Sequence, residues 1–150
     1  MNHRRADFPF RAPAPFSEMA DAENRLVEVN TPAIPAKLLA LARRIKAARN
    51  ARDTFFHPDL FADPAWDMML ALYIAEGDGC RLKVSDLCNE SGVPNTTALR
   101  WIERLVELGM ARKRRHPLDG RAIFVEIDRE TTRKLTAYLE KIWSRYFPLV

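Results

Sequence analysis

The sequence is poor in cysteine and in long apolar stretches, and each shortage excludes a class of protein. Only two cysteines, Cys80 and Cys88, occur in 150 residues. That is too few for a disulfide scaffold or for the roughly four thiolate or imidazole ligands of a closed zinc site. No apolar run approaches the roughly 18 to 20 residues of a membrane helix, and residues 1–16 lack the core of a signal peptide. We therefore expect a cytoplasmic protein without a structural metal.

The sequence also lacks a recognisable set of catalytic residues. Its three histidines are scattered, and no glycine-rich phosphate loop, metal-ligand spacing or nucleophile with a neighbouring base is present. The nearest thing to a carboxylate cluster consists of Asp63, Asp67, Glu76 and Asp78. Helix capping and solvation account for these four side chains. We therefore predict neither catalysis nor a cofactor.

What remains is the composition of one globular domain, with 47% hydrophobic and 29% charged residues. Residues 1–35 carry five prolines and no lasting periodicity, which predicts a disordered or extended arm. The folded domain is then expected over residues 36–150, with a core at 61–128 and flanking helices within 36–60 and 129–147.

Periodicity predicts a mainly helical domain. Apolar residues recur every three or four positions at about 36–56, 64–76, 86–91, 95–108 and 129–147. The predicted helix caps are Asp63, Ser85, Asn95 and Asp128. The expected β structure is a short extended piece at 81–84 and a hairpin at 110–127 with its turn at 117–120. No strands and helices alternate as a parallel sheet requires, so the predicted fold class is mainly α with a small β wing.

Basic residues are concentrated in one stretch. The formal net charge is +4, and residues 95–121 contain seven basic side chains against three acidic ones. The excess of this stretch equals that of the whole chain, because the other 17 basic and 17 acidic residues cancel. A local excess of this kind indicates a polyanionic partner better than the overall charge does.

The predicted helix at 95–108 has the character of a recognition helix. Its apolar arc consists of Ala98, Leu99, Ile102, Leu105 and Val106. The side chains available for DNA are Asn95 at its start and, on the opposite arc, Thr96, Thr97, Arg100 and Arg104. Arginine can donate two hydrogen bonds to guanine, and threonine can bond to base edges or phosphates. A short helix and a tight turn precede this segment, which matches a helix-turn-helix motif.

The predicted hairpin offers a second set of contacts. Its first strand carries four consecutive cations, namely Arg112, Lys113, Arg114 and Arg115. About half of them can face one side because strand side chains alternate. Arg121 follows the turn and is placed to reach a narrow minor groove, while Asp119 could accept a hydrogen bond from its guanidinium.

The stretch VSDLCNESGVPNTTALRWIERLVELGMARKRRHPLDGRAIFVEID resembles the winged helix-turn-helix core of MarR-type transcriptional regulators. The resemblance includes the Asp-x-Arg signature of the wing at Asp119-Gly120-Arg121. It implies a homodimer formed by the N- and C-terminal helices. The side chains expected at that dimer interface are Leu38, Leu41, Ile45, Leu135, Leu139, Ile142 and Tyr146.

Together these features predict sequence-specific binding of double-stranded DNA and transcriptional regulation by a homodimer. Two-fold symmetry would make the operator a pseudo-palindrome whose equivalent contacts lie about 10 base pairs apart. The sequence leaves a small-molecule effector open and names none. The alternative is a winged-helix module that docks an acidic protein through its basic hairpin, and weak, salt-insensitive duplex binding would favour it.

Overall fold

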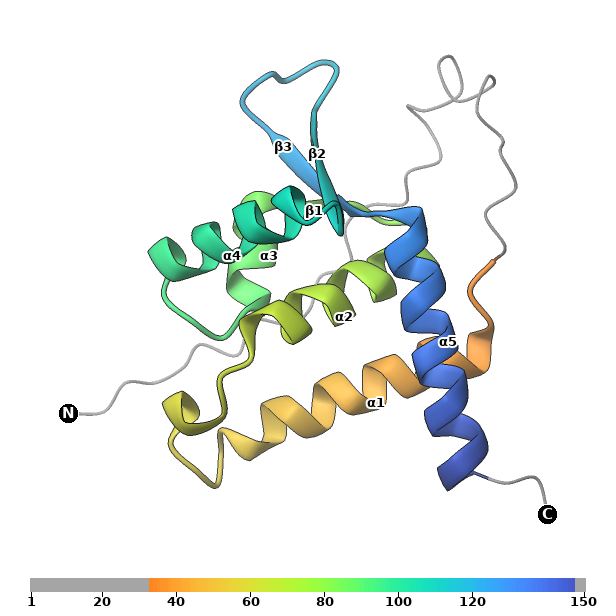
Figure 1. Cartoon of the computed structure of the whole chain (residues 1–150). Coiled ribbons are helices and arrows are strands. Elements are labelled where there is room, and N and C mark those ends of the chain that lie inside the picture. The colour runs from red at the N-terminus through yellow and green to blue at the C-terminus, as the bar shows by residue number, and fades with distance from the viewer. Residues whose placement is uncertain (1–32, 148–150) are drawn as a thin grey trace.

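The computed structural model describes residues 33–147, so the predicted N-terminal arm lies almost entirely outside the described residues. Figure 1 shows a helical body with one projecting β-hairpin. The elements are α1 (Ala36–Arg52), the 3-10 helix η3 (Pro58–Phe61), α2 (Pro64–Gly77), β1 (Leu82–Lys83), α3 (Val84–Glu90), α4 (Asn95–Glu107), β2 (Ala111–Arg115), β3 (Ile123–Ile127) and α5 (Arg129–Tyr146). No helix in this part of the chain is long and apolar enough to cross a membrane.

The three strands form one antiparallel sheet in the order β1-β3-β2. Together with three helices, these strands follow the chain order α2, β1, α3, α4, β2, β3. This order is the arrangement of a winged helix. The predicted fold class, mainly α with a small β wing, is confirmed. Helices α1 and α5 flank this core as expected.

Local signals place some helix ends and misplace others. Asp63 and Asp128 cap α2 and α5 as predicted, because each carboxylate accepts a hydrogen bond from a backbone N–H of the first turn. The predictions for Ser85 and Asn95 are wrong, since both lie inside their helices. At α3 the carboxylate of Asp86 reaches back and accepts from the backbone N–H of Lys83 at 3.2 Å.

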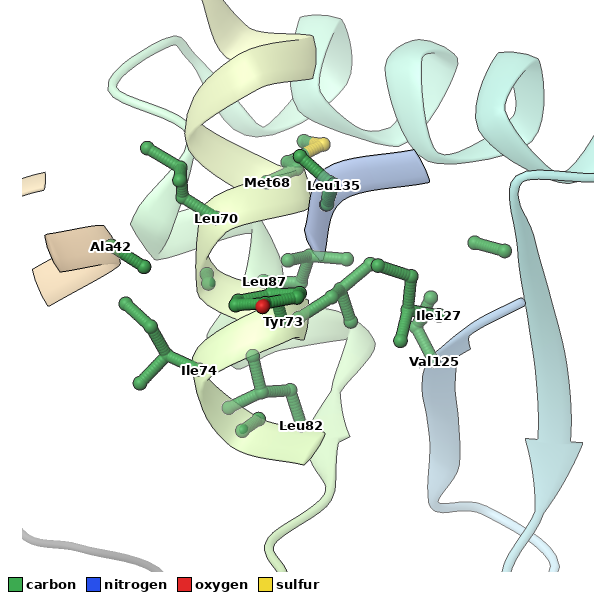
Figure 2. Close-up of a cluster of buried hydrophobic side chains, with 14 of the residues drawn as sticks. Ala42, Met68, Leu70, Tyr73, Ile74, Leu82, Leu87, Val125, Ile127 and Leu135 are labelled. Carbon is green, nitrogen blue, oxygen red and sulfur yellow. The ribbon is translucent and has the colours of Figure 1, made fainter. Parts of the chain in front are cut away.

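Helix α2 is the centre of the hydrophobic core. Six consecutive residues, 70–75, are buried, so all sides of the helix are covered. Figure 2 shows Tyr73 and Met68 of α2 among Leu87 of α3, Val125 of β3 and Leu135 of α5. A helix that is apolar all round requires such enclosure, and α1, α3, α4 and β3 pack around it.

The outer helices bury much of their apolar faces inside the single chain, including four of the residues expected at the dimer interface. Leu38 and Leu41 of α1 and Leu135 and Leu139 of α5 are each no more than 5% exposed in the single chain. They are buried because α1 packs on both α2 and α5. Ile45 and Ile142 are partly buried, and Tyr146 is the one expected interface residue that is largely exposed, at 68%.

Ion pairs fasten α1 to the rest of the body. Arg49 contacts both oxygens of Asp67, at 2.5 and 3.2 Å, and this interaction raises the pKa of the guanidinium. Arg43 pairs with Asp78 of the α2 C-cap, and Lys46 with Glu90 of α3. The four carboxylates that come nearest to a cluster in the sequence thus have structural partners. Asp63 caps α2, Asp67 and Asp78 form ion pairs, and Glu76 accepts a hydrogen bond.

Glu76 is a half-buried carboxylate at the end of α2. It accepts a hydrogen bond from the Thr132 hydroxyl of α5 at 2.5 Å, and it lines a cavity of about 360 Å³ between α2 and the wing. Burial raises the pKa of Glu76 above its ordinary value. The Thr132 hydrogen bond and the charges of Arg112 and Arg129 oppose this shift without cancelling it.

The raised pKa predicts a pH-dependent stability. A carboxyl whose pKa is higher in the folded state favours folding below its unfolded pKa, and this contribution is lost as the pH rises through the folded pKa. The variant Glu76→Gln can still bond to Thr132 but carries no buried charge. It should therefore have a higher free energy of unfolding than the wild type at pH 7. Near pH 4, at about the ordinary glutamate pKa, the difference should shrink.

Urea unfolding at the two pH values measures this difference. Glu107→Gln, at an exposed position of α4, serves as the control and should stay within about 0.5 kcal/mol of the wild type. A Glu76→Gln variant less stable than the wild type at pH 7 would contradict the prediction.

Candidate nucleic-acid interface

Helices α3 and α4 and the turn between them form a helix-turn-helix. Ser91, which is fully buried, pins the turn because its hydroxyl donates to the carbonyl of Cys88 at 2.6 Å and accepts from the N–H of Val93 at 3.3 Å. Gly92 follows with a φ of 70°, a left-handed conformation that favours glycine. Sequence patterns had not singled out Ser91, although a serine at a helix end is a common local acceptor.

Helix α4 buries one face and exposes the other. Ala98, Ile102 and Leu105 are buried against the body, whereas Leu99, expected in the apolar arc, is 44% exposed at its edge. All five expected DNA-contacting residues of α4 are exposed, namely Asn95, Thr96, Thr97, Arg100 and Arg104.

The two halves of the exposed α4 face differ in charge. In the C-terminal half, Arg104 pairs with Glu107 at 3.3 Å, and Glu103 pairs with Lys113 of β2. The N-terminal half carries Thr96, Thr97 and Arg100 and no acidic side chain. The free cationic charge therefore lies at the end of α4 that enters the major groove first in a helix-turn-helix.

The register of the wing sorts its four consecutive cations into two pairs. Arg112 and Arg114 lie opposite Glu126 and Phe124 of β3. Arg114 pairs with Glu126 at 2.8 Å, and Arg112 lies 4.0 Å from Asp128. Lys113 and Arg115 alternate with them, and the pair between Lys113 and Glu103 links this side of the wing to α4.

Three of the expected DNA-contacting cations have no acidic partner. Within residues 33–147, no carboxylate lies within ion-pair distance of Arg100, Arg115 or Arg121. All three are exposed. One stands on α4, one at the end of β2 and one just past the turn of the wing.

The tip of the wing is closed by hydrogen bonds within the segment 116–122. The backbone N–H groups of His116 and Ala122 donate to the carbonyls of Ala122 and Asp119, at 2.9 and 3.0 Å. The carboxylate of Asp119 accepts from the backbone N–H of Arg121 at 3.1 Å. This differs from the expected contact with the Arg121 guanidinium, and it leaves that guanidinium unpaired. Asp119 is therefore a turn residue that directs the chain at Arg121.

Helix α4 and the wing lie on one side of the molecule. In Figure 1 they stand across α2 from α1, and β2 packs against α4. A helix flanked by a projecting hairpin, with unpaired arginines on both, has the shape and charge to contact adjacent grooves of a duplex.

The fold and this surface define a winged helix-turn-helix protein. Among solved structures, the chain is similar to NadR in complex with 4-hydroxyphenylacetate, at 21% identity and a TM-score of 0.47 over 73% of this chain and 68% of that one. It is also similar to the heme sensor protein PefR from Streptococcus agalactiae in complex with heme, at 14% identity and a TM-score of 0.46 over 76% and 78% of the two chains.

A further similar structure is wild-type MarR from E. coli in its apo form, at 15% identity and a TM-score of 0.43 over 73% of this chain and 77% of that one. The sequence resembles MarR-type regulators, and MarR itself is one of the solved structures to which the chain is similar. No protein-family model and no curated protein matches the chain.

The role of Asp119 can be tested by two substitutions, one that keeps an acceptor oxygen for the N–H of Arg121 and one that removes it. Asp119→Asn keeps an oxygen for the N–H of Arg121 and removes a negative charge, so duplex affinity should be unchanged or higher. Asp119→Ala removes the acceptor and should weaken duplex binding roughly 2- to 10-fold, the worth of one hydrogen bond. Fluorescence anisotropy with a labelled duplex measures both, and equal losses in the two variants would contradict a turn role.

Proposed function

We propose that this protein binds double-stranded DNA in a sequence-specific manner as a homodimer and regulates transcription. Helix α4 lies in the major groove, and the wing of residues 110–127 lies at the adjacent minor groove. The observation that carries the proposal is a set of three exposed arginines on α4 and the wing, Arg100, Arg115 and Arg121, that have no acidic partner within the described residues 33–147.

The residue types fit this division of labour. Arg100, with Thr96 and Thr97 beside it, supplies donors that distinguish base edges in the major groove. Arg115 and Arg121 flank the wing tip, where cations bind phosphates or a narrow minor groove. The remaining expected cations, Arg104, Arg112, Lys113 and Arg114, each lie within ion-pair distance of a carboxylate, so a phosphate there competes with that carboxylate.

The alternative, docking of an acidic protein through the wing, uses the cations of the wing, including Arg115 and Arg121, but gives α4 no role. Its exposed N-terminal half carries hydrogen-bonding threonines next to Arg100, a combination suited to base edges. Salt-sensitive affinity for duplexes separates the two functions.

Two substitutions separate base recognition from phosphate binding. Arg100→Ala should reduce the preference for the best duplex by roughly 1–3 kcal/mol, because a bidentate contact to a base is lost. Arg121→Ala should weaken binding to all duplexes. It should also lower the slope of log affinity against log salt by about 1.8, or 0.9 for each subunit of a dimer.

Selection from a random duplex pool followed by anisotropy titrations at several salt concentrations measures both effects. Arg133→Ala removes the same charge from α5, where Arg133 already pairs with Glu130, and should change neither preference nor slope. An Arg100→Ala variant with full sequence preference would exclude Arg100 from base recognition. A wild-type protein without salt-sensitive duplex affinity would favour acidic-protein docking.

The proposed dimer depends on apolar groups that the single chain leaves exposed. Tyr146 and Phe147, at the end of α5, are 68% and 41% exposed. Phe147 stacks on Trp143 with 4.9 Å between ring centroids. The face of α5 that buries Leu135 and Leu139 continues to Tyr146, where the described part of the chain leaves the ring largely exposed. A second copy of the chain would cover this end.

Replacing Tyr146 by serine should therefore weaken the dimer. We expect sedimentation equilibrium to show wild-type dimers at concentrations where Tyr146→Ser is largely monomeric, with unchanged far-ultraviolet circular dichroism. Leu118→Ser, at an equally exposed apolar position on the wing tip, should leave the dimer intact. A wild-type protein that stays monomeric at high concentration would contradict the homodimer.

A further inference from the structure

His116 closes the tip of the wing with its side chain. It lies between the end of β2 and the turn, and its ring Nδ1 accepts hydrogen bonds from two backbone N–H groups, those of Leu118 at 3.1 Å and Asp119 at 3.0 Å. The other side of the ring lies beside Phe124 of β3, with 5.5 Å between ring centroids. The imidazole is therefore held in one orientation between the turn and a strand.

These two hydrogen bonds fix the tautomer of the neutral ring. A ring nitrogen that accepts hydrogen bonds carries no proton, so the single ring proton is on Nε2. The two nitrogens lie on either side of Cε1. The Nε2–H bond is therefore directed away from the two backbone N–H groups that donate to Nδ1. Within the described residues, Nε2 has no hydrogen-bond partner.

The free donor lies at the tip of the wing, which also carries two cations that have no carboxylate partner within residues 33–147. Arg115 precedes His116 directly, and Arg121 leaves the same hydrogen-bonded turn. His116 itself is partly exposed. Side chains alternate along an extended segment, so His116 lies on the Phe124 side of the ribbon and Arg115 on the other. A fixed donor at the tip of a hairpin that also carries Arg115 and Arg121 is suited to a phosphodiester oxygen.

We propose that His116 is a DNA-contacting residue of the wing. Its Nε2–H donates to a phosphodiester oxygen, while its Nδ1 holds the turn that presents Arg121. This inference rests on the proposed DNA binding and adds a contact of a different kind. A neutral donor displaces no counterion, so it contributes affinity without adding to the salt dependence.

The tautomer is tested without DNA. Long-range proton–nitrogen NMR correlations of the imidazole, recorded at about pH 8, where an ordinary histidine is neutral, should show Nε2 protonated and Nδ1 unprotonated. A proton on Nδ1 would overturn the inference whether or not the protein binds DNA.

Three substitutions at His116 separate the turn from the contact. His116→Asn places an oxygen near the position of Nδ1 and keeps the acceptor for the turn, but it lacks the outer donor. His116→Gln has an amide that reaches the position of Nε2 and lacks the inner acceptor. His116→Ala lacks both. Amide hydrogen exchange at Leu118 and Asp119 reports directly whether each variant keeps the turn.

The binding probe is a mixed-sequence duplex of about 30 base pairs, long enough for two half-sites one helical turn apart. His116→Asn should keep the turn amides protected and bind roughly 2- to 10-fold more weakly, with an unchanged salt slope. His116→Ala should bind most weakly, and His116→Gln more tightly than His116→Ala. The loss should be equal on A·T-rich and G·C-rich duplexes, because phosphate oxygens carry no sequence.

The matched control is His57→Asn. His57 also accepts a backbone hydrogen bond through Nδ1, from the N–H of Asp59 at 3.4 Å, but it lies in the connection between α1 and α2. This control should bind as the wild type does. Wild-type affinity in His116→Asn, or a loss confined to one duplex sequence, would overturn the phosphate contact. A wild-type protein that binds no duplex would overturn the proposed function instead, and the tautomer result would stand.

Discussion

The structure depends on the enclosure of α2 at residues 70–75. Six consecutive buried residues leave this helix no side that can face water, so every neighbouring element is held to it by loss of apolar surface from solvent. The same packing fixes where α4 can expose its polar face, because the buried side chains Ala98 and Ile102 turn the opposite face outward. The position of the surface proposed to read DNA is therefore a consequence of the core.

Local sequence signals predict the helices well because they act over a few residues. Asp63 and Asp128 cap their helices through a carboxylate and the first turn, and the periodicity of α4 places its exposed threonines and arginines correctly. Helix α2 is less well predicted. Its pattern suggests one apolar face that includes Trp66 and Met69, yet these two are only half-buried while the whole run 70–75 is enclosed.

Features that depend on partners distant in sequence could not be predicted. An amphipathic pattern shows that a face is buried but not what covers it, and the apolar faces of α1 and α5 therefore look available for a second subunit. The structure gives these faces to the same chain, leaving Tyr146 exposed at the end. Similarly, nothing in the run of four cations shows that the register of β3 sets Arg114 beside Glu126, or that Lys113 meets Glu103.

The pairing of cations with carboxylates has a consequence for how this surface meets a polyanion. Lys113 already pairs with Glu103, so a phosphate at Lys113 competes with that carboxylate. The displaced carboxylate then lies beside the phosphate and repels it. A count of lysines and arginines thus overstates the attraction this surface exerts. If the proposed function holds, a polyanion that contacts only one of these cations gains little there. A ligand that fits both the helix and the hairpin would gain the contacts that compensate for the broken ion pairs.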